Sequence, residues 1–388
     1  DLKGKIFQHT QGLLFLLCEL HPTNKIKYIR MKDLIKLLLL LLFCFQLSCT
    51  SDKSSWPDSK NWAWMYPSRE FSENDWNSQL ISIQDAGIDG ILLLKRSEDP
   101  KDFETICRKI KESGFELHVW IPVNNPHGAD SLEVAHPDWY QVSREGKSCL
   151  TDPPYIPSYK WLCPNNPDAR KYLISVMDEL AALEYLDGVH LDYIRFPDVI
   201  LPVGIQPKYK LTQDKEYAEF DFCYCEHCRE KFQEETGLDP IDLDDPASNE
   251  AWVQFRYSSI TSLVHDIKEK VHNHKKKLSA AVFPTPELAK KLVRQDWTNW
   301  GLDEVMPMIY HQYYFEPLSW IETATSEGIN ALPATSEYFS GLFINEIKPK
   351  DFADAVNYAK TAGADGICLF NGNGMSKKQW KALKRALD

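Results

Sequence analysis

Residues 188–197 carry the most informative chemistry of this chain. They read GVHLDYIRFP, in which polar and apolar residues alternate as far as Asp192 and a cationic residue, Arg195, follows. Alternation along a strand places His190 and Asp192 on one face, with the apolar residues on the other. We expect Asp192 at the tip of a barrel strand, where Arg195 would keep it ionised as a nucleophile, a base or a stabiliser of positive charge. The alternative is an ion pair that only ties the strand to its loop.

A second carboxyl group is normally needed to cleave a glycosidic bond, because one carboxyl must protonate the leaving oxygen. Glu337 follows the predicted seventh strand and is the first candidate for this acid. Glu287, after the fifth strand, is the second candidate, although it could simply begin a helix. Glu304 begins the sixth strand, so we place it at the floor of the barrel. The predicted catalytic group is therefore Asp192, Glu337 and Arg195.

Aromatic and amide side chains near the ends of other predicted strands are typical of a sugar-binding cavity. The faces of a sugar are apolar and its edges carry hydroxyls, so rings and amides complement it. The predicted substrate-binding residues are Trp64, Tyr66, Trp120, Asn124, His190, Tyr310 and Asn371. The alternative is that the tryptophans belong to the core.

Three thiols lie within six residues, at Cys223, Cys225 and Cys228. Zinc normally takes four ligands, so Cys163, Cys149 or a nearby Asp or His would have to complete a site. Disulfides compete with metal in an exported protein, but the predicted mature chain leaves an odd number of cysteines to pair. We expect a structural metal site, with zinc as the possible ion, and no cofactor for catalysis.

These residues need a scaffold, and short apolar runs alternate with helical stretches throughout residues 61–388. Strands are predicted at 61–66, 90–95, 116–123, 188–194, 278–283, 304–310, 329–336 and 366–370. Helices are predicted at 73–86, 102–113, 167–183, 252–273, 287–300, 317–327, 350–362 and 376–387. Eight strand–helix pairs predict an α/β fold, the (β/α)8 TIM barrel, as a single domain. Long loops follow the third strand (124–166) and the fourth (198–250), where a barrel keeps its active site.

The N-terminal part of the chain has the layout of an export signal. Residues 1–30 are interpreted as non-native upstream sequence, and 31–48 as a lipoprotein signal peptide with a basic start and an apolar run too short to span a bilayer. Cys49 is the predicted lipidation site, although Gln46 departs from the usual aliphatic residue, and 49–60 is a polar tether. An ordinary signal peptide is the alternative. We expect an exported protein anchored to a bacterial membrane by lipid.

Charge narrows the ligand class. The net charge of −12 becomes −16 without residues 1–48, which carry seven Lys or Arg and three Asp or Glu. Nucleic-acid binding requires clustered cations, so it is excluded as a function, and a neutral ligand is favoured.

Four motifs together resemble the bacterial glycosyl hydrolase-like 10 family. They are HPDW at 136–139, PNNPDAR at 164–170, DGVHLDYIRFP at 187–197 and MPMIY at 306–310, in the family's order. The resemblance covers most of 61–388 and implies a (β/α)8 glycoside hydrolase, often exported or lipid-anchored, that acts on polysaccharides or cell-wall glycans. It also implies a functional role for Asp192, whereas Glu337 matches no motif of the family.

The combined hypothesis is hydrolysis of O-glycosidic bonds in a polysaccharide or cell-wall glycan by two carboxylates. One alternative is a non-catalytic glycan-binding lipoprotein on the same scaffold. Another is a metal-dependent hydrolase, which the absence of a His-x-His pair on the first predicted strand disfavours.

Overall fold

Eight parallel strands close into a barrel in the computed structural model, which describes residues 56, 59–67, 73–95, 100–126 and 128–388. Each strand pairs with the next along the chain, and β1 closes the ring against β8. The strands are β1 (Trp62–Met65), β2 (Gly90–Leu94), β3 (Glu116–Pro122), β4 (Gly188–Asp192), β5 (Lys277–Val282), β6 (Glu304–Pro307), β7 (Glu337–Phe343) and β8 (Gly366–Phe370).

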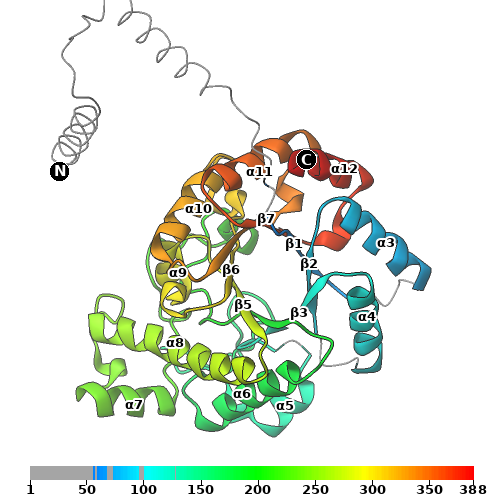
Figure 1. The fold of residues 1–388 in the computed structure, drawn as a ribbon. Coiled ribbons are helices and arrows are strands. Elements are labelled where there is room, and N and C mark those ends of the chain that lie inside the picture. Colours follow the sequence, from blue (N-terminus) through cyan, green and yellow to red (C-terminus); the bar gives the residue numbers. More distant parts are fainter. Residues whose placement is uncertain (1–55, 57–58, 68–72, 96–99, 127) are drawn as a thin grey trace, which may run out of the picture. The chain divides into compact units, whose positions relative to one another are not determined.

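Helices surround this barrel (Figure 1). Those that follow the strands are α3 (Glu73–Asp85), α4 (Pro100–Glu112), α6 (Pro167–Ala181), α8 (Glu250–Asn273), α9 (Pro286–Val293), α10 (Trp320–Ala331), α11 (Phe352–Thr361) and α12 (Lys377–Leu387). The predicted TIM barrel is therefore confirmed. Because the helices cover the outer face of the barrel, every residue of β2 and β4, and all but the last residue of β8, is buried.

The predicted seventh strand, at 329–336, was wrong. Residues up to Ala331 belong to helix α10, and Pro333 follows its last turn. A proline disfavours helical geometry in the residue before it, so the helix ends there and the strand begins only at Glu337. This shift moves Glu337 from the end of a strand to its beginning.

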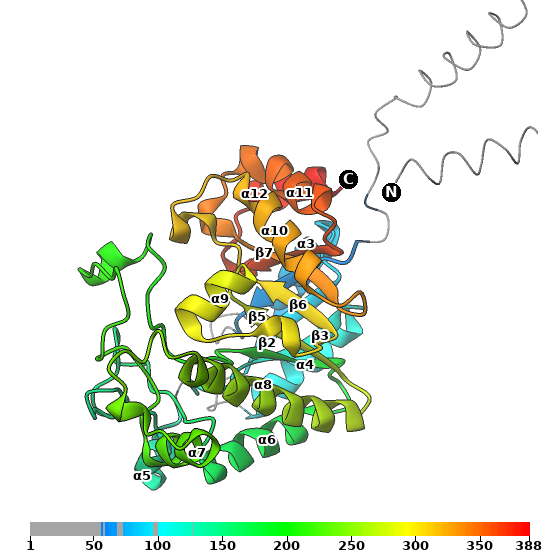
Figure 2. The ribbon, with the colours of Figure 1, turned by 90° about the vertical axis from the view of Figure 1, so that its left-hand side faces the viewer.

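The two long connections were predicted correctly but contain short helices. The connection after β3 includes α5 (Asp130–Ala135), and the connection after β4 includes α7 (Glu226–Thr236). Figure 2 shows these green segments projecting on one side of the barrel. They are linked to each other by an antiparallel bridge between Ser143 and Phe222.

Ionic contacts close the floor of the barrel. Glu304 is fully buried at the start of β6, as predicted, and Lys277 Nζ lies 2.6 Å from its Oε1. Lys60 pairs with Glu116 at the start of β3. These two lysines supply the positive charge that burial of a carboxylate requires.

No helix in the described part of the chain is long and apolar enough to cross a membrane. The predicted signal peptide, Cys49 and most of the tether lie outside the described residues.

Candidate active site

A cavity of ≈ 1060 Å³ opens at the carboxyl ends of the strands. Most strands contribute a residue at or just beyond their last position. These residues are Tyr66 after β1, Leu94 on β2, Pro122 on β3, Asp192 on β4, Phe283 after β5, Met308 after β6 and Phe370 on β8. This is the end of the barrel at which TIM-barrel enzymes carry their active sites.

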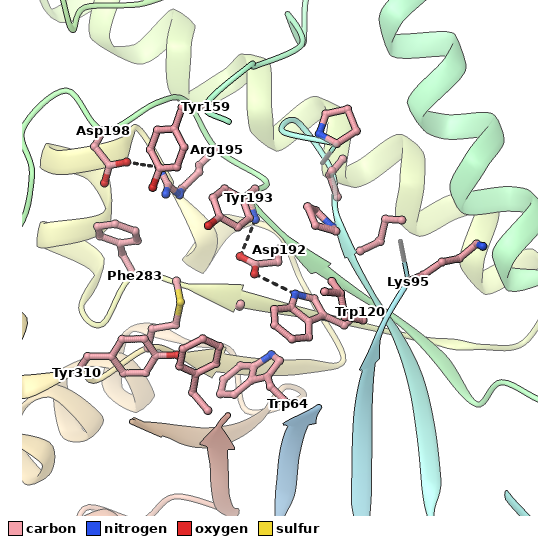
Figure 3. A pocket seen from close by; sticks show the side chains of 18 of the residues that line it. Trp64, Lys95, Trp120, Tyr159, Asp192, Tyr193, Arg195, Asp198, Phe283 and Tyr310 are labelled. Carbon is pink, nitrogen blue, oxygen red and sulfur yellow. Dashed lines mark hydrogen bonds and ion pairs between the residues drawn. The ribbon is translucent and has the colours of Figure 1, made fainter. Parts of the chain in front are cut away.

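Asp192 lies at the base of this cavity, held by two hydrogen bonds (Figure 3). The indole Nε1–H of Trp120 donates to Oδ2 at 2.9 Å, and the backbone N–H of Tyr193 donates to Oδ1 at 2.7 Å. Tyr193 adopts a left-handed conformation with φ 49°, an unusual backbone state for a residue other than glycine. The predicted position of Asp192 is confirmed.

Burial sets the protonation of Asp192. Loss of hydration raises the pKa of this carboxyl, although the hydrogen bonds from Tyr193 and Trp120 and the charge of Arg195 act in the opposite direction. Burial therefore outweighs the groups that favour the ionised form, and the carboxyl retains its proton to a higher pH than an exposed aspartate.

The predicted partnership of Arg195 with Asp192 was wrong. Arg195 Nη1 instead donates to Asp198 Oδ2 at 3.0 Å, and both side chains are less than a tenth exposed. The guanidinium also lies 4.8 Å from the ring of Trp161 and 5.1 Å from that of Phe283. Arg195 therefore acts on Asp192 by long-range electrostatic attraction rather than as its ion-pair partner. The left-handed turn at Tyr193 separates the two side chains. Asp198 was missed, although its spacing from Arg195 could have indicated a pair.

Neither predicted acid lines the cavity. Glu337 begins β7 on the floor side, where its exposed side chain lies 3.5 Å from Lys277. Glu287 is exposed in the first turn of α9. Glu337 is the first residue of β7 and the cavity lies beyond the last, so Glu337 cannot contact the same substrate as Asp192. Among the described residues, Asp198 is the one other carboxylate that lines the cavity.

Glu346 occupies the place that was predicted for Glu337, just beyond the cavity end of β7. It contacts the segment that follows β6, where the backbone N–H of Gln312 donates to its Oε2 at 3.2 Å and His311 Nδ1 lies 3.3 Å away. Burial raises the pKa of Glu346 to about 7. It does not line the cavity and was not predicted as a site residue.

Four of the predicted binding residues do line the cavity: Trp64, Tyr66, Trp120 and Tyr310. Their rings lie close together, with 5.3 Å between the centroids of Tyr66 and Trp120. The facing wall comes from the long connections, which add Tyr159 and Tyr209. The sequence placed both long connections at the active-site end of the barrel but did not single out Tyr159 or Tyr209.

The other three predicted binding residues do not line the cavity. His190 lies beneath the cavity, where its Nε2 accepts the indole N–H of Trp64 at 2.9 Å and its Nδ1 lies 2.9 Å from Ser279 Oγ. Burial lowers the pKa of His190 well below its ordinary value, so it is a neutral support for Trp64. Asn124 is buried and donates to the Leu162 carbonyl at 3.4 Å. Asn371 forms a left-handed turn after β8.

Cys223, Cys225 and Cys228 also lie outside the cavity lining. Their sulfurs gather with that of Cys163, one of the three kinds of fourth ligand that the sequence left open. This group could hold a metal, but it contributes no residue to the cavity.

The barrel and its cavity define a TIM-barrel protein whose candidate site is built from aromatic rings and carboxylates at the carboxyl ends of the strands. The model of the family described as glycosyl hydrolase-like 10 matches residues 89–349. The chain belongs to that family, as its motifs predicted. A comparison with curated proteins found no match.

Solved structures of glycosidases share the fold. The PgaB (BpsB) glycoside hydrolase domain from Bordetella bronchiseptica superposes with a TM-score of 0.61 at 13% identity, over 85% of this chain and 99% of that domain. The β-amylase catalytic domain from Paenibacillus polymyxa gives 0.57 at 14% identity, over 85% and 98% of the two chains. A β-galactosidase from Bacillus circulans gives 0.56 at 13% identity, over 85% and 55%. These structures show the shared fold, and membership of the glycosyl hydrolase-like 10 family supports glycan hydrolysis in general.

Proposed function

We propose that this protein hydrolyses O-glycosidic bonds in a polysaccharide or cell-wall glycan, with Asp192 as the proton donor and Asp198 as the second carboxylate. One observation carries the proposal: the cavity presents two carboxyl groups in contrasting surroundings. Asp192 is buried with no cation bound to it, whereas Asp198 is paired with Arg195. Paired carboxyls in contrasting surroundings are how glycosidases divide acid and base roles.

The two roles follow from the local chemistry. A leaving sugar oxygen needs a proton, and the raised pKa of Asp192 lets this carboxyl keep one for donation. A second carboxylate must act from the other side of the bond as nucleophile or base, and we assign this role to Asp198, which lines the same cavity 3.0 Å from the Arg195 guanidinium. This assignment replaces Glu337 as the acid and changes the role first predicted for Asp192.

The cavity walls suit a neutral glycan. Aromatic rings from β1, β3 and β8 face tyrosines of the long connections, so a sugar ring would find apolar surfaces on more than one side. The chain's net charge of −12 agrees with an uncharged substrate. We further propose export and lipid anchoring at Cys49, which would place the enzyme beside such glycans; both rest on the sequence alone.

Turnover of a glycan panel tests the proposal. The purified protein and its Asp192→Asn variant would be incubated with neutral polysaccharides and peptidoglycan glycan strands, and new reducing ends followed by mass spectrometry. We expect products from the parent protein and none from the variant in the same time. Equal product formation by both proteins would rule out Asp192 as the acid.

The alternative function is glycan binding without catalysis, which the aromatic walls would serve equally well. It predicts that both proteins bind a glycan with the same affinity and that neither releases products. Calorimetric titration with the same panel distinguishes the two functions.

Trp120 is expected to set the alkaline limit of activity. Its indole N–H favours the ionised form of Asp192, so Trp120→Phe should raise the pKa of this carboxyl further. Because an acid fails when it loses its proton, the alkaline limb of kcat/KM should move to higher pH. Trp64→Phe is the matched control, since the indole of Trp64 lines the same cavity but donates to His190. A shift in the control alone would contradict this role of Trp120.

A further inference from the structure

We propose that Cys163, Cys223, Cys225 and Cys228, here called the cysteine cluster, bind one Zn²⁺ at a structural site that joins the two long connections. All four sulfurs lie within 4.8 Å of one another, and all four residues are buried. Cys163 Sγ is 3.5 Å from the sulfurs of both Cys225 and Cys228. A Zn–S bond of about 2.3 Å gives a tetrahedron with edges of roughly 3.8 Å, which these separations approach.

Hydrogen-bond donors surround the cysteine cluster as they surround metal-bound thiolates. The backbone N–H of Val142 points to Cys223 Sγ at 3.4 Å. Asn165 directs its backbone N–H to one sulfur at 3.4 Å and its side-chain amide to another at 3.3 Å. Lys231 Nζ in turn donates to the side-chain amide oxygen, Oδ1, of Asn165 at 3.2 Å, so a positive charge lies next to the residue that contacts the sulfurs. Four thiolates around Zn²⁺ carry a net charge of −2, and such donors stabilise it.

The donor set selects the metal class. Four sulfurs in a tetrahedral arrangement fit zinc or iron, whereas oxygen-seeking ions such as Mg²⁺ and Ca²⁺ would not be held. Four protein ligands also leave no open position for water, so the site fits a structural rather than a catalytic metal. Its separation from the cavity lining agrees with this assignment.

The cysteine cluster joins segments that the chain separates by 60 residues. Cys163 lies near the end of the connection after β3, three residues before Asn166, which caps the start of α6. Cys225 and Cys228 bracket the first turn of α7 in the connection after β4. Trp161, two residues before Cys163, packs against the guanidinium of Arg195. A metal here would therefore support the wall of the cavity from behind.

Metal content of the purified protein tests the site without reference to catalysis. Protein purified without chelator should hold about one zinc per chain by plasma mass spectrometry, and a double variant, Cys163→Ser with Cys228→Ser, should hold less than about one tenth of that. Cys107→Ser is the matched control, because Cys107 is a buried free thiol in α4 outside the cysteine cluster, and it should keep its zinc.

Two further measurements on the parent protein keep the test independent of how the variant folds. Exchange of zinc for Co²⁺ should give the thiolate charge-transfer and tetrahedral d–d absorption bands expected of four sulfur ligands. The seven cysteines from Cys107 to Cys368 should all react with a thiol reagent after denaturation with chelator. Iron in place of zinc, or four thiols missing because of two disulfides, would overturn the proposal. Either result would leave the proposed glycosidase activity untouched.

Discussion

Asp192→Asn is expected to lower kcat on an unactivated glycan by about 10³-fold, the usual contribution of a positioned acid. The amide keeps the shape of the side chain but has no acidic proton to give, and its single oxygen can accept only one of the two N–H groups, from Trp120 and Tyr193, that the carboxyl accepts. Aryl glycosides with an acidic phenol need no protonation, so their hydrolysis should fall less than about tenfold. Steady-state kinetics on one glycan and one dinitrophenyl glycoside measure the difference.

An equal loss on both substrates would contradict the acid role and indicate a nucleophile or base instead. Stability provides the control for folding. The folded state raises the pKa of Asp192 above its value in the unfolded chain, so its contribution to stability is full below the unfolded pKa and is lost as pH rises through the folded pKa. The free energy of unfolding of the variant should therefore fall less than that of the parent protein as pH rises through the folded pKa of Asp192.

Arg195→Met is expected to destabilise the protein by about 3–5 kcal/mol, because it leaves Asp198 as a buried carboxylate without its cation. Urea unfolding followed by tryptophan fluorescence measures the loss. The double variant that adds Asp198→Asn removes both charges and should recover part of it. Full recovery is not expected, since the guanidinium also packs against Trp161 and Phe283.

Arg170→Met serves as the matched control for that experiment. Arg170 Nη2 lies 2.6 Å from Asp266, but this aspartate is half exposed. Loss of the ion pair should therefore lower the free energy of unfolding by less than about 1 kcal/mol. A similar loss in both arginine variants would show that burial does not decide the strength of the Asp198 pair.

The barrel was predictable because its signal is repeated eight times, so an error in one element does not alter the architecture. The position of a single site residue, by contrast, depends entirely on the bounds of its own strand. Reading the apolar run at 329–336 as a strand placed Glu337 at the cavity end, although Pro333 marks the end of a helix. An error of a few residues reversed the end of the barrel at which this carboxylate lies.

The alternation of side chains was enough to predict which residues of the fourth strand face the barrel interior, and His190 and Asp192 do face it. Beyond Asp192 the left-handed turn at Tyr193 ends that alternation, which is why Arg195 was assigned to the wrong carboxylate. Cys163 could be named as one option but not selected, because only the three-dimensional fold brings it to residues 60 positions later.

The ionic floor and the cavity lie at opposite ends of the same strands. Lys277 and Glu304 hold one end, while the connections after β3 and β4 supply walls at the other. This division makes the molecule modular: a connection could be exchanged for that of a relative without removing a charge from the floor. Substrate preference could then diversify, in evolution or by loop grafting, while the folded barrel stays the same.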